Sequence, residues 1–137
     1  MASRDLSERN PVAHVDDYTA ALSRLSLSAG SETSLEMHIY KDGRPATDLH
    51  PYLQALAHAI AIDAKDLTYI HVHPVMLLRG TPATSSARVM VYSNDRMTVP
   101  PDMLIRLTAR EAGTYKLWLQ FRGGSSLHVA SFVLTAS

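Results

Sequence analysis

The side chains in this sequence that could do chemistry are above all its histidines. An imidazole nitrogen is a good ligand for zinc, copper and nickel, and the ring changes its charge near neutral pH. The chain has no cysteine, which excludes thiolate metal sites, disulfides and thiol nucleophiles. The histidines are therefore the first candidates for a functional site, and there are seven: His14, His38, His50, His58, His71, His73 and His128.

Three of these histidines are predicted to lie on two neighbouring strands. His71 and His73 are two residues apart, so on a strand both point to one face and could chelate one metal ion. His58 precedes them on a strand that ends at a predicted turn over 63–66, and antiparallel pairing would bring it level with residues 71–73. Three imidazoles and a water would form an open tetrahedral site for copper or zinc.

The predicted faces of these two strands disagree. Ile70 and Val72 alternate with the paired histidines and look like core residues, which would turn the histidines outward. His58, however, shares its face with Ile60 and Ile62, which also look like core. A bulge would reconcile the faces. The alternative is that the histidines lie on an exposed face, where they are solvated or hydrogen-bonded and bind no metal.

Other residues extend the metal hypothesis or stand apart from it. His38, on a neighbouring alternating run, is a candidate fourth ligand, and Met76 could supply a thioether to copper. His50 is expected to cap a short helix or to face solvent. His14 and His128 are expected at the surface.

The sequence carries no signature of an enzyme or of a nucleic-acid-binding protein. It lacks a glycine-rich phosphate loop, a nucleophile elbow and a zinc-protease helix, so we expect a binding protein and not an enzyme. Lys+Arg and Asp+Glu both total 13, and a neutral chain does not attract nucleic acid. No apolar run approaches the roughly 20 residues that span a bilayer. The expected partner is a metal ion or a protein.

The first residues contain no apolar signal region. The protein is therefore expected to be periplasmic or secreted if a signal peptide has been removed, and cytoplasmic otherwise.

The elements that must position these residues are predicted to be strands. Short alternating apolar runs are separated by turn signals, which is typical of an all-β domain. We expect a flexible tail over 1–13, a single domain over 14–137, and one short helical segment over 48–56, where apolar residues have helical spacing. Gly-Gly at 123–124 predicts a β-hairpin. The predicted strands cover residues 15–22, 25–27, 35–40, 57–62, 67–73, 88–92, 103–107, 115–121 and 127–134.

One segment resembles the corner between the fifth and sixth strands of immunoglobulin-like sandwiches. In Glu111-Ala112-Gly113-Thr114-Tyr115-Lys116-Leu117 a tyrosine follows a glycine by two and begins a strand. In that family the tyrosine hydroxyl bonds to upstream backbone, and Leu117 stands where antibody domains have a cysteine. The resemblance implies an immunoglobulin-like antiparallel β-sandwich.

A broader pattern is similar to sandwich modules of bacterial extracytoplasmic proteins, some of which are associated with heavy-metal handling. It covers roughly residues 25–134 and includes Asp42-Gly43-Arg44-Pro45 and Tyr69-Ile70-His71-Val72-His73-Pro74.

Three functions remain open on these grounds. The first is an extracytoplasmic module that binds copper or zinc through His58, His71 and His73. The second is a structural or protein-interaction module that pairs through an edge strand or an exposed apolar patch. The third is an enzyme that uses His58 or His71 as a base, which requires a pocket with a carboxylate behind the imidazole.

Overall fold

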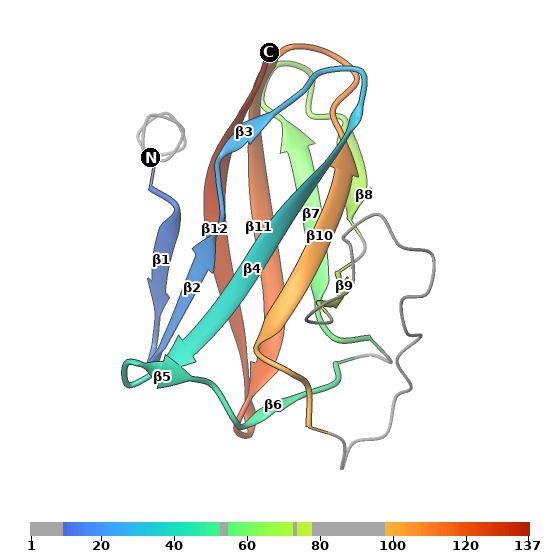
Figure 1. Cartoon of the computed structure of the whole chain (residues 1–137). Coiled ribbons are helices and arrows are strands. Elements are labelled where there is room, and N and C mark those ends of the chain that lie inside the picture. Colours follow the sequence, from blue (N-terminus) through green and yellow to red (C-terminus); the bar gives the residue numbers. More distant parts are fainter. Residues whose placement is uncertain (1–9, 53–54, 73, 78–97) are drawn as a thin grey trace.

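The computed structural model describes residues 10–52, 55–72, 74–77 and 98–137, and it confirms the all-β sandwich (Figure 1). The described part of the chain contains no helix, and thus no apolar helix that could span a membrane. The strands form two sheets that face each other, and each sheet has six members.

The first sheet, sheet A, has the order β1-β2-β4-β10-β9, with β5 paired to β4. Its members are β1 (Val12–Val15), β2 (Tyr18–Leu22), β4 (Glu32–Lys41), β5 (Arg44–Pro45), β9 (Val75–Met76) and β10 (Asp102–Thr108). The second, sheet B, has the order β3-β12-β11-β7-β8, with β6 paired to β11. Its members are β3 (Ser26–Leu27), β6 (Leu49–His50), β7 (His58–Asp63), β8 (Tyr69–Val72), β11 (Gly113–Gly123) and β12 (Ser126–Ala136).

The core lies between the sheets and follows directly from side-chain alternation. On β4 and on β11 every second residue is buried, which is the pattern of strands with one face on a core and the other toward solvent. The largest fully buried side chains come from both sheets and include Leu35, Met37, Ile39, Met103, Ile105, Leu117, Leu119, Phe121 and Leu134.

The predicted hairpin is the longest strand pairing among the described residues. Strands β11 and β12 pair over their whole length, from Gly113 opposite Ala136 to Gly123 opposite Ser126. This register leaves Gly124 and Ser125 as a two-residue turn, and Gly124 has a φ of 60°. Two-residue hairpin turns need such left-handed backbone, which glycine adopts without strain.

The resemblance to the immunoglobulin-like corner is confirmed in its key contact. The side chain of Tyr115 is buried, and its hydroxyl donates a hydrogen bond to the carbonyl oxygen of Glu111 at 2.8 Å. Burial raises the pKa of this hydroxyl above its ordinary value. The bond fixes the connection between β10 and β11 at one end of the sandwich.

The helical segment predicted over 48–56 is wrong in the described residues of that stretch. Leu49 and His50 form β6, and Tyr52 and Ala55 exchange backbone hydrogen bonds as an isolated bridge. Leu49 and Leu56 are both buried, so the chain reaches the core at these two points without a helix in the described residues. A few apolar residues at helical spacing are thus also compatible with an irregular segment whose backbone bonds to neighbouring strands.

One predicted strand also differs from the structure. The run 15–22 forms two strands, because the chain reverses between β1 and β2 at Asp16, where φ is 55°. The first strand begins at Val12, two residues before the predicted start of the domain. The strand predicted at 88–92 lies outside the described residues.

The corner contact predicts a specific loss of stability. Tyr115→Phe removes only the hydroxyl and leaves the Glu111 carbonyl without this donor. We expect the free energy of unfolding in urea to fall by about 1 kcal/mol, the net contribution of a typical hydrogen bond. Tyr40→Phe, on the outer face of sheet A, is the control. Equal stability of Tyr115→Phe and the parent would show that the corner is dispensable.

Candidate functional site

The register of β7 resolves the conflict between the two predicted histidine faces. Ala59 and Ala61 are buried, whereas Ile60 is 46% exposed, so the alanines and not the isoleucines face the core. The predicted face of this strand is therefore wrong. The reason lies in the partner strand: Ala61 pairs with the buried Leu117, and Ile60 pairs with the outward Trp118.

His58 consequently lies on the outer face of sheet B. Its Nε2 donates a hydrogen bond to the carbonyl oxygen of Tyr52 at 2.8 Å, and its ring packs edge-on against the Tyr52 ring. Because a carbonyl can only accept, the proton of the neutral ring is on Nε2, and Nδ1 carries the lone pair. In the backbone register residue 71 lies opposite Ile60, and residue 72 lies opposite Ala59 instead of His58. His73 lies outside the described residues.

The other two predicted ligands lie elsewhere. The ring nitrogens of His38 face two carboxylates on the outer face of sheet A, Nδ1 at 2.6 Å from Asp102 and Nε2 at 3.3 Å from Glu36. Met76 is paired with the fully buried Met103 and packs against the core. His58, His38 and Met76 thus lie on three different surfaces and do not share one site. Within the described ranges, no three His, Cys, Asp or Glu residues are grouped so that they could hold a metal ion.

His128 was predicted at the surface, and this is wrong. It is 7% exposed, with its ring centroid 4.6 Å from that of Tyr18 and 5.3 Å from that of Phe121. Its Nδ1 lies 2.6 Å from a carboxylate oxygen of Asp16, and its Nε2 lies 3.2 Å from the carbonyl oxygen of Gly123. His128 therefore connects the β1–β2 turn to the end of β11 from inside the molecule. By contrast, His14 is exposed, as predicted.

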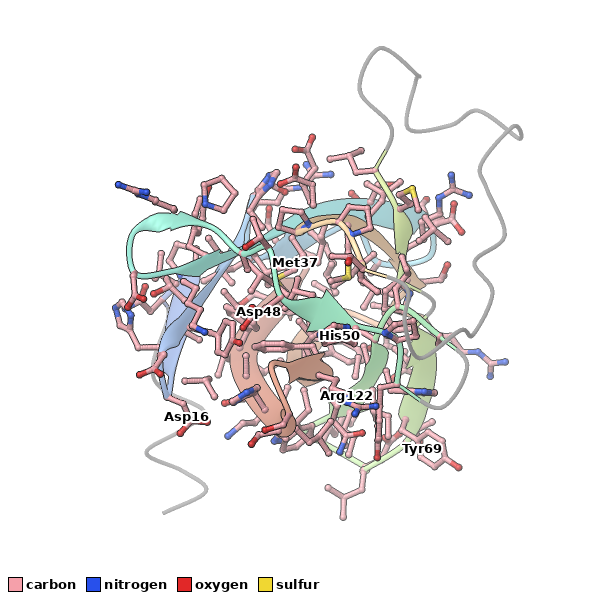
Figure 2. The ribbon with its side chains drawn as sticks, turned by 90° about the horizontal axis from the view of Figure 1, so that it is seen from below. Asp16, Met37, Asp48, His50, Tyr69 and Arg122 are labelled. Carbon is pink, nitrogen blue, oxygen red and sulfur yellow. The ribbon has the colours of Figure 1, made fainter. Side chains whose placement is uncertain are left out.

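A polar network at the same end of the sandwich was not anticipated from the sequence. One carboxylate oxygen of Asp48 accepts hydrogen bonds from the Tyr18 hydroxyl at 2.7 Å and from the Lys41 ammonium at 2.9 Å. The Asp48 carbonyl accepts the amide of Gly124. Seen from below, Asp48 lies near the middle of this end, with Asp16 to one side (Figure 2). The network links β2, β4 and the β11–β12 turn.

Burial and hydrogen bonding act on this network in opposite directions. Burial disfavours the charged form of Asp48, but the bonds from Tyr18 and Lys41 outweigh it, and the pKa of Asp48 lies below its ordinary value. Burial, together with the bond to Asp48, raises the pKa of Tyr18 to about 12. At neutral pH the Asp48 carboxyl is thus ionised and the Tyr18 hydroxyl keeps its proton, as expected of a structural contact.

The outer face of sheet B carries a group of apolar side chains, two of which, Ile60 and Ile62, had been predicted to lie in the core. A shallow groove of about 330 Å³ runs over the outward side chains of β7, β11 and β12. In the register Trp118 lies between Ile60 and Ser131, and Gln120 lies between His58 and Val129. We call this surface the Trp118 face, and its groove is lined by His58, Ile60, Ile62, Trp118, Gln120 and Val129.

Apolar residues outside the groove extend this surface. Leu127 is 42% exposed beyond Val129, and Tyr69 is 63% exposed on β8, opposite Ile62. On the side of β12 that faces away from β11, strand β1 contacts β12 and shields Val133, which is buried. The sequence signal that could have revealed the Trp118 face is the polarity of the residues that alternate with the core on β11. Lys116, Gln120 and Arg122 lie on the same side of β11 as Trp118, which indicates that this side faces solvent.

The Asp48 network predicts a pH-dependent contribution to stability. A carboxyl whose pKa is lowered by folding stabilises the fold above its unfolded pKa and loses that contribution as the pH falls through the folded value. Asp48→Asn should lower the free energy of unfolding at pH 7, and the difference from the parent should shrink as the pH falls below the ordinary value of 3.8. Glu32→Gln, at an exposed position of β4, removes one carboxylate outside the network and is the control. A difference that persists unchanged at low pH would contradict the ionised network.

Comparison with known proteins bears on the fold and the family. No curated protein sequence matches the chain. Among solved structures, the chain is similar to the crystal structure of a "Putative Lipoprotein from Bacillus anthracis", with 15% identity and a TM-score of 0.50, over 99% of this chain and 91% of that one. At this identity the likeness concerns the fold alone. Neither this description nor that of the matching family mentions a metal, so the association with heavy-metal handling stays a prediction.

The family comparison is more direct. A family model described as "Domain of unknown function (DUF8832)" matches residues 13–137. This range contains every strand described above except for Val12, the first residue of β1. The chain therefore belongs to the DUF8832 family.

Proposed function

We propose that this protein is an extracytoplasmic binding module that docks a protein partner on the Trp118 face. One observation carries the proposal: apolar side chains from three adjacent strands gather around a groove on the solvent side of a sheet. A β-sandwich can leave that side polar, as the alternation along β4 shows, so the apolar side chains are not required by the fold.

The composition of the Trp118 face fits a protein interface. Exposed contiguous apolar surface on a soluble domain marks interaction sites, whereas single exposed apolar residues carry no such meaning. Ile60 on β7 is 46% exposed, and Val129 on β12 is 43% exposed. These two strands lie on either side of β11, which carries Trp118. Tryptophan at the centre of a patch is the residue type that dominates binding energy in protein interfaces.

Two observations support the other parts of the proposal. The fold likeness to a protein described as a lipoprotein supports an extracytoplasmic location. The hydrogen bonds of His58 on β7 and His128 on β12 support binding there in preference to catalysis: His58 is oriented by a backbone carbonyl, and His128, which has a carboxylate partner, is buried with both ring nitrogens engaged. His38, which also has a carboxylate partner, lies on the other sheet. None of these three imidazoles combines an orienting carboxylate with access to the groove, which a general base would require.

A second candidate function, metal binding through His58, His71 and His73, keeps one supporting observation. His58 faces outward with Nδ1 available, and the backbone of residue 71 lies across from the adjacent Ile60. Copper or zinc would suit such imidazole ligands. His38 and Met76 would not belong to this site, because they lie on sheet A.

Calorimetric titration decides the metal candidate. Copper(II) or zinc is titrated into chelator-treated protein and into a His71→Ala/His73→Ala variant. The metal candidate predicts stoichiometric binding with a dissociation constant below about 1 μM, at least 8 kcal/mol, that the variant loses. His14→Ala/His50→Ala is the control with equal histidine content. Binding that is weak or unchanged in the His71/His73 variant would exclude the candidate.

The docking proposal is tested with the only tryptophan of the chain as the reporter. Peptides of about 16 residues, long enough to cover roughly 24 Å as a helix, are selected by display on the immobilised domain. Selected peptides should shift the emission of Trp118, and Ile60→Ala should weaken them by about 2 kcal/mol or thirtyfold, as expected at the centre of an interface. Tyr40→Ala on sheet A should leave binding unchanged.

Two results would contradict the docking proposal. One is a selection that yields no peptide sensitive to Ile60→Ala. The other is peptides whose binding leaves the emission of Trp118 unaltered.

A further inference from the structure

The ring of His128 joins two hairpins at the end of the sandwich that Figure 2 views from below. Its side chain is 7% exposed and packs against the rings of Tyr18 and Phe121. Its Nδ1 lies 2.6 Å from a carboxylate oxygen of Asp16, and its Nε2 lies 3.2 Å from the carbonyl oxygen of Gly123. Asp16 belongs to the tight turn between β1 and β2, whereas Gly123 ends β11.

The two oxygens that face the ring fix the number of protons that these contacts need. A carbonyl oxygen can only accept a hydrogen bond, and so can an ionised carboxylate. Neutral imidazole has one N–H, so each of its tautomers leaves the other nitrogen with its lone pair against an oxygen. The imidazolium donates from both nitrogens and satisfies both contacts. The short distance to Asp16 is in keeping with a charge-assisted bond.

Other histidines of the protein do not share this arrangement. His58 has one ring nitrogen on a carbonyl, and His14 has one on the Thr19 hydroxyl, which can donate or accept. His38 has a carboxylate at each ring nitrogen, but its side chain is 28% exposed, so water competes for both contacts. Of these four histidines, His128 is the one whose two contacts are shielded from water.

The neighbouring ionisable groups keep one charge over the pH range in which a histidine titrates. Burial, together with the bond to Asp48, raises the pKa of the Tyr18 hydroxyl to about 12. Burial disfavours the charged form of Asp48, but the bonds from Tyr18 and Lys41 outweigh it and hold its pKa below the ordinary value. The hydrogen bond to Asp48 raises the pKa of Lys41. Among these described groups, a change between pH 6 and pH 9 is therefore due to His128 and Asp16.

We infer that His128 is a proton-operated latch between the β1–β2 turn and the β11–β12 hairpin. The imidazolium closes the latch, because it donates to both oxygens. When the ring loses one proton, one of the two contacts becomes an approach of two acceptors and is lost. A histidine whose charged form is bonded in the fold contributes stability that is fully present below about pH 6.5, where the unfolded histidine is charged too, and that is lost at higher pH. This end of the sandwich is therefore held more firmly at pH 6 than at pH 9.

The first measurement is made on the ring itself. The ¹⁵N chemical shifts of the His128 ring are recorded from pH 5 to pH 10 and are assigned by their absence from His128→Gln. The inference predicts that the ring is predominantly the imidazolium at pH 7, where the histidines of an unfolded chain are mostly neutral. A ring with only one protonated nitrogen at pH 7 would overturn the latch.

The second measurement tests whether the Asp16 carboxylate closes the latch. Asp16→Asn removes the charge and keeps a residue type that tolerates the left-handed backbone of this position. Asp17→Asn makes the same change in charge at the neighbouring exposed position of the same turn and is the matched control. At pH 7 the His128 ring should be mostly neutral in Asp16→Asn and should stay charged in Asp17→Asn. Equal charge on the ring in both variants would overturn the inference.

Stability gives an independent readout of the same proton. Unfolding in urea is compared for Asp16→Asn and the parent at pH 6 and at pH 9. Any pH dependence from His38 is present in both proteins and cancels in this comparison. The unfolding constant of Asp16→Asn, divided by that of the parent, should fall by about tenfold from pH 6 to pH 9, whereas the ratio for Asp17→Asn should stay constant. A ratio for Asp16→Asn that does not change with pH would show that the contacts hold without the second proton, and it would overturn the latch.

Discussion

The strict alternation of side chains along β11 is the constraint on which the rest of the structure depends. Tyr115, Leu117, Leu119 and Phe121 all point between the sheets and are almost completely buried. β11 pairs with β12, β7 and β6, so its alternation sets the faces of three other strands. Once these four side chains are inside, the residues between them must be outside, and Trp118 is one of them. The apolar core and the Trp118 face are thus two consequences of one pattern.

The end of β11 shows how tightly the core is tied to the surrounding loops. A Cβ atom on Gly123 would lie 2.5 Å from Cζ and Oη of Tyr18, so only glycine allows this approach. Tyr18 in turn bonds to Asp48 and packs against His128. The Gly-Gly pair at the hairpin therefore has two separate roles: Gly123 admits the Tyr18 ring, and Gly124 supplies the left-handed turn.

The sequence predicted those features that depend on local pattern and failed where distant contacts decide. The β11–β12 hairpin and the Tyr115 corner follow from residues close together in the chain, and both are confirmed. The helix over 48–56 was wrong because the backbone there bonds to β11 and to Val99, which no local pattern reveals. His128 is buried against Tyr18 and bonded to Asp16, which is 112 residues away in the sequence. For the site, residue type pointed to the histidines. The register of β7 on β11 decides which residues of β7 face solvent, and the sequence does not show this register. Apolar side chains on an exposed face, such as Ile60, cannot be distinguished from core residues by their type.

The central claim is that the Trp118 face is covered by a partner where the protein works. A photoreactive phenylalanine analogue placed at Val129, in the organism that makes the protein, tests this most directly, with Tyr40 on the opposite sheet as the reference position. Our account predicts a discrete covalent adduct with another protein at position 129 and none at position 40. Adducts at position 40 alone, or none at position 129, would contradict it.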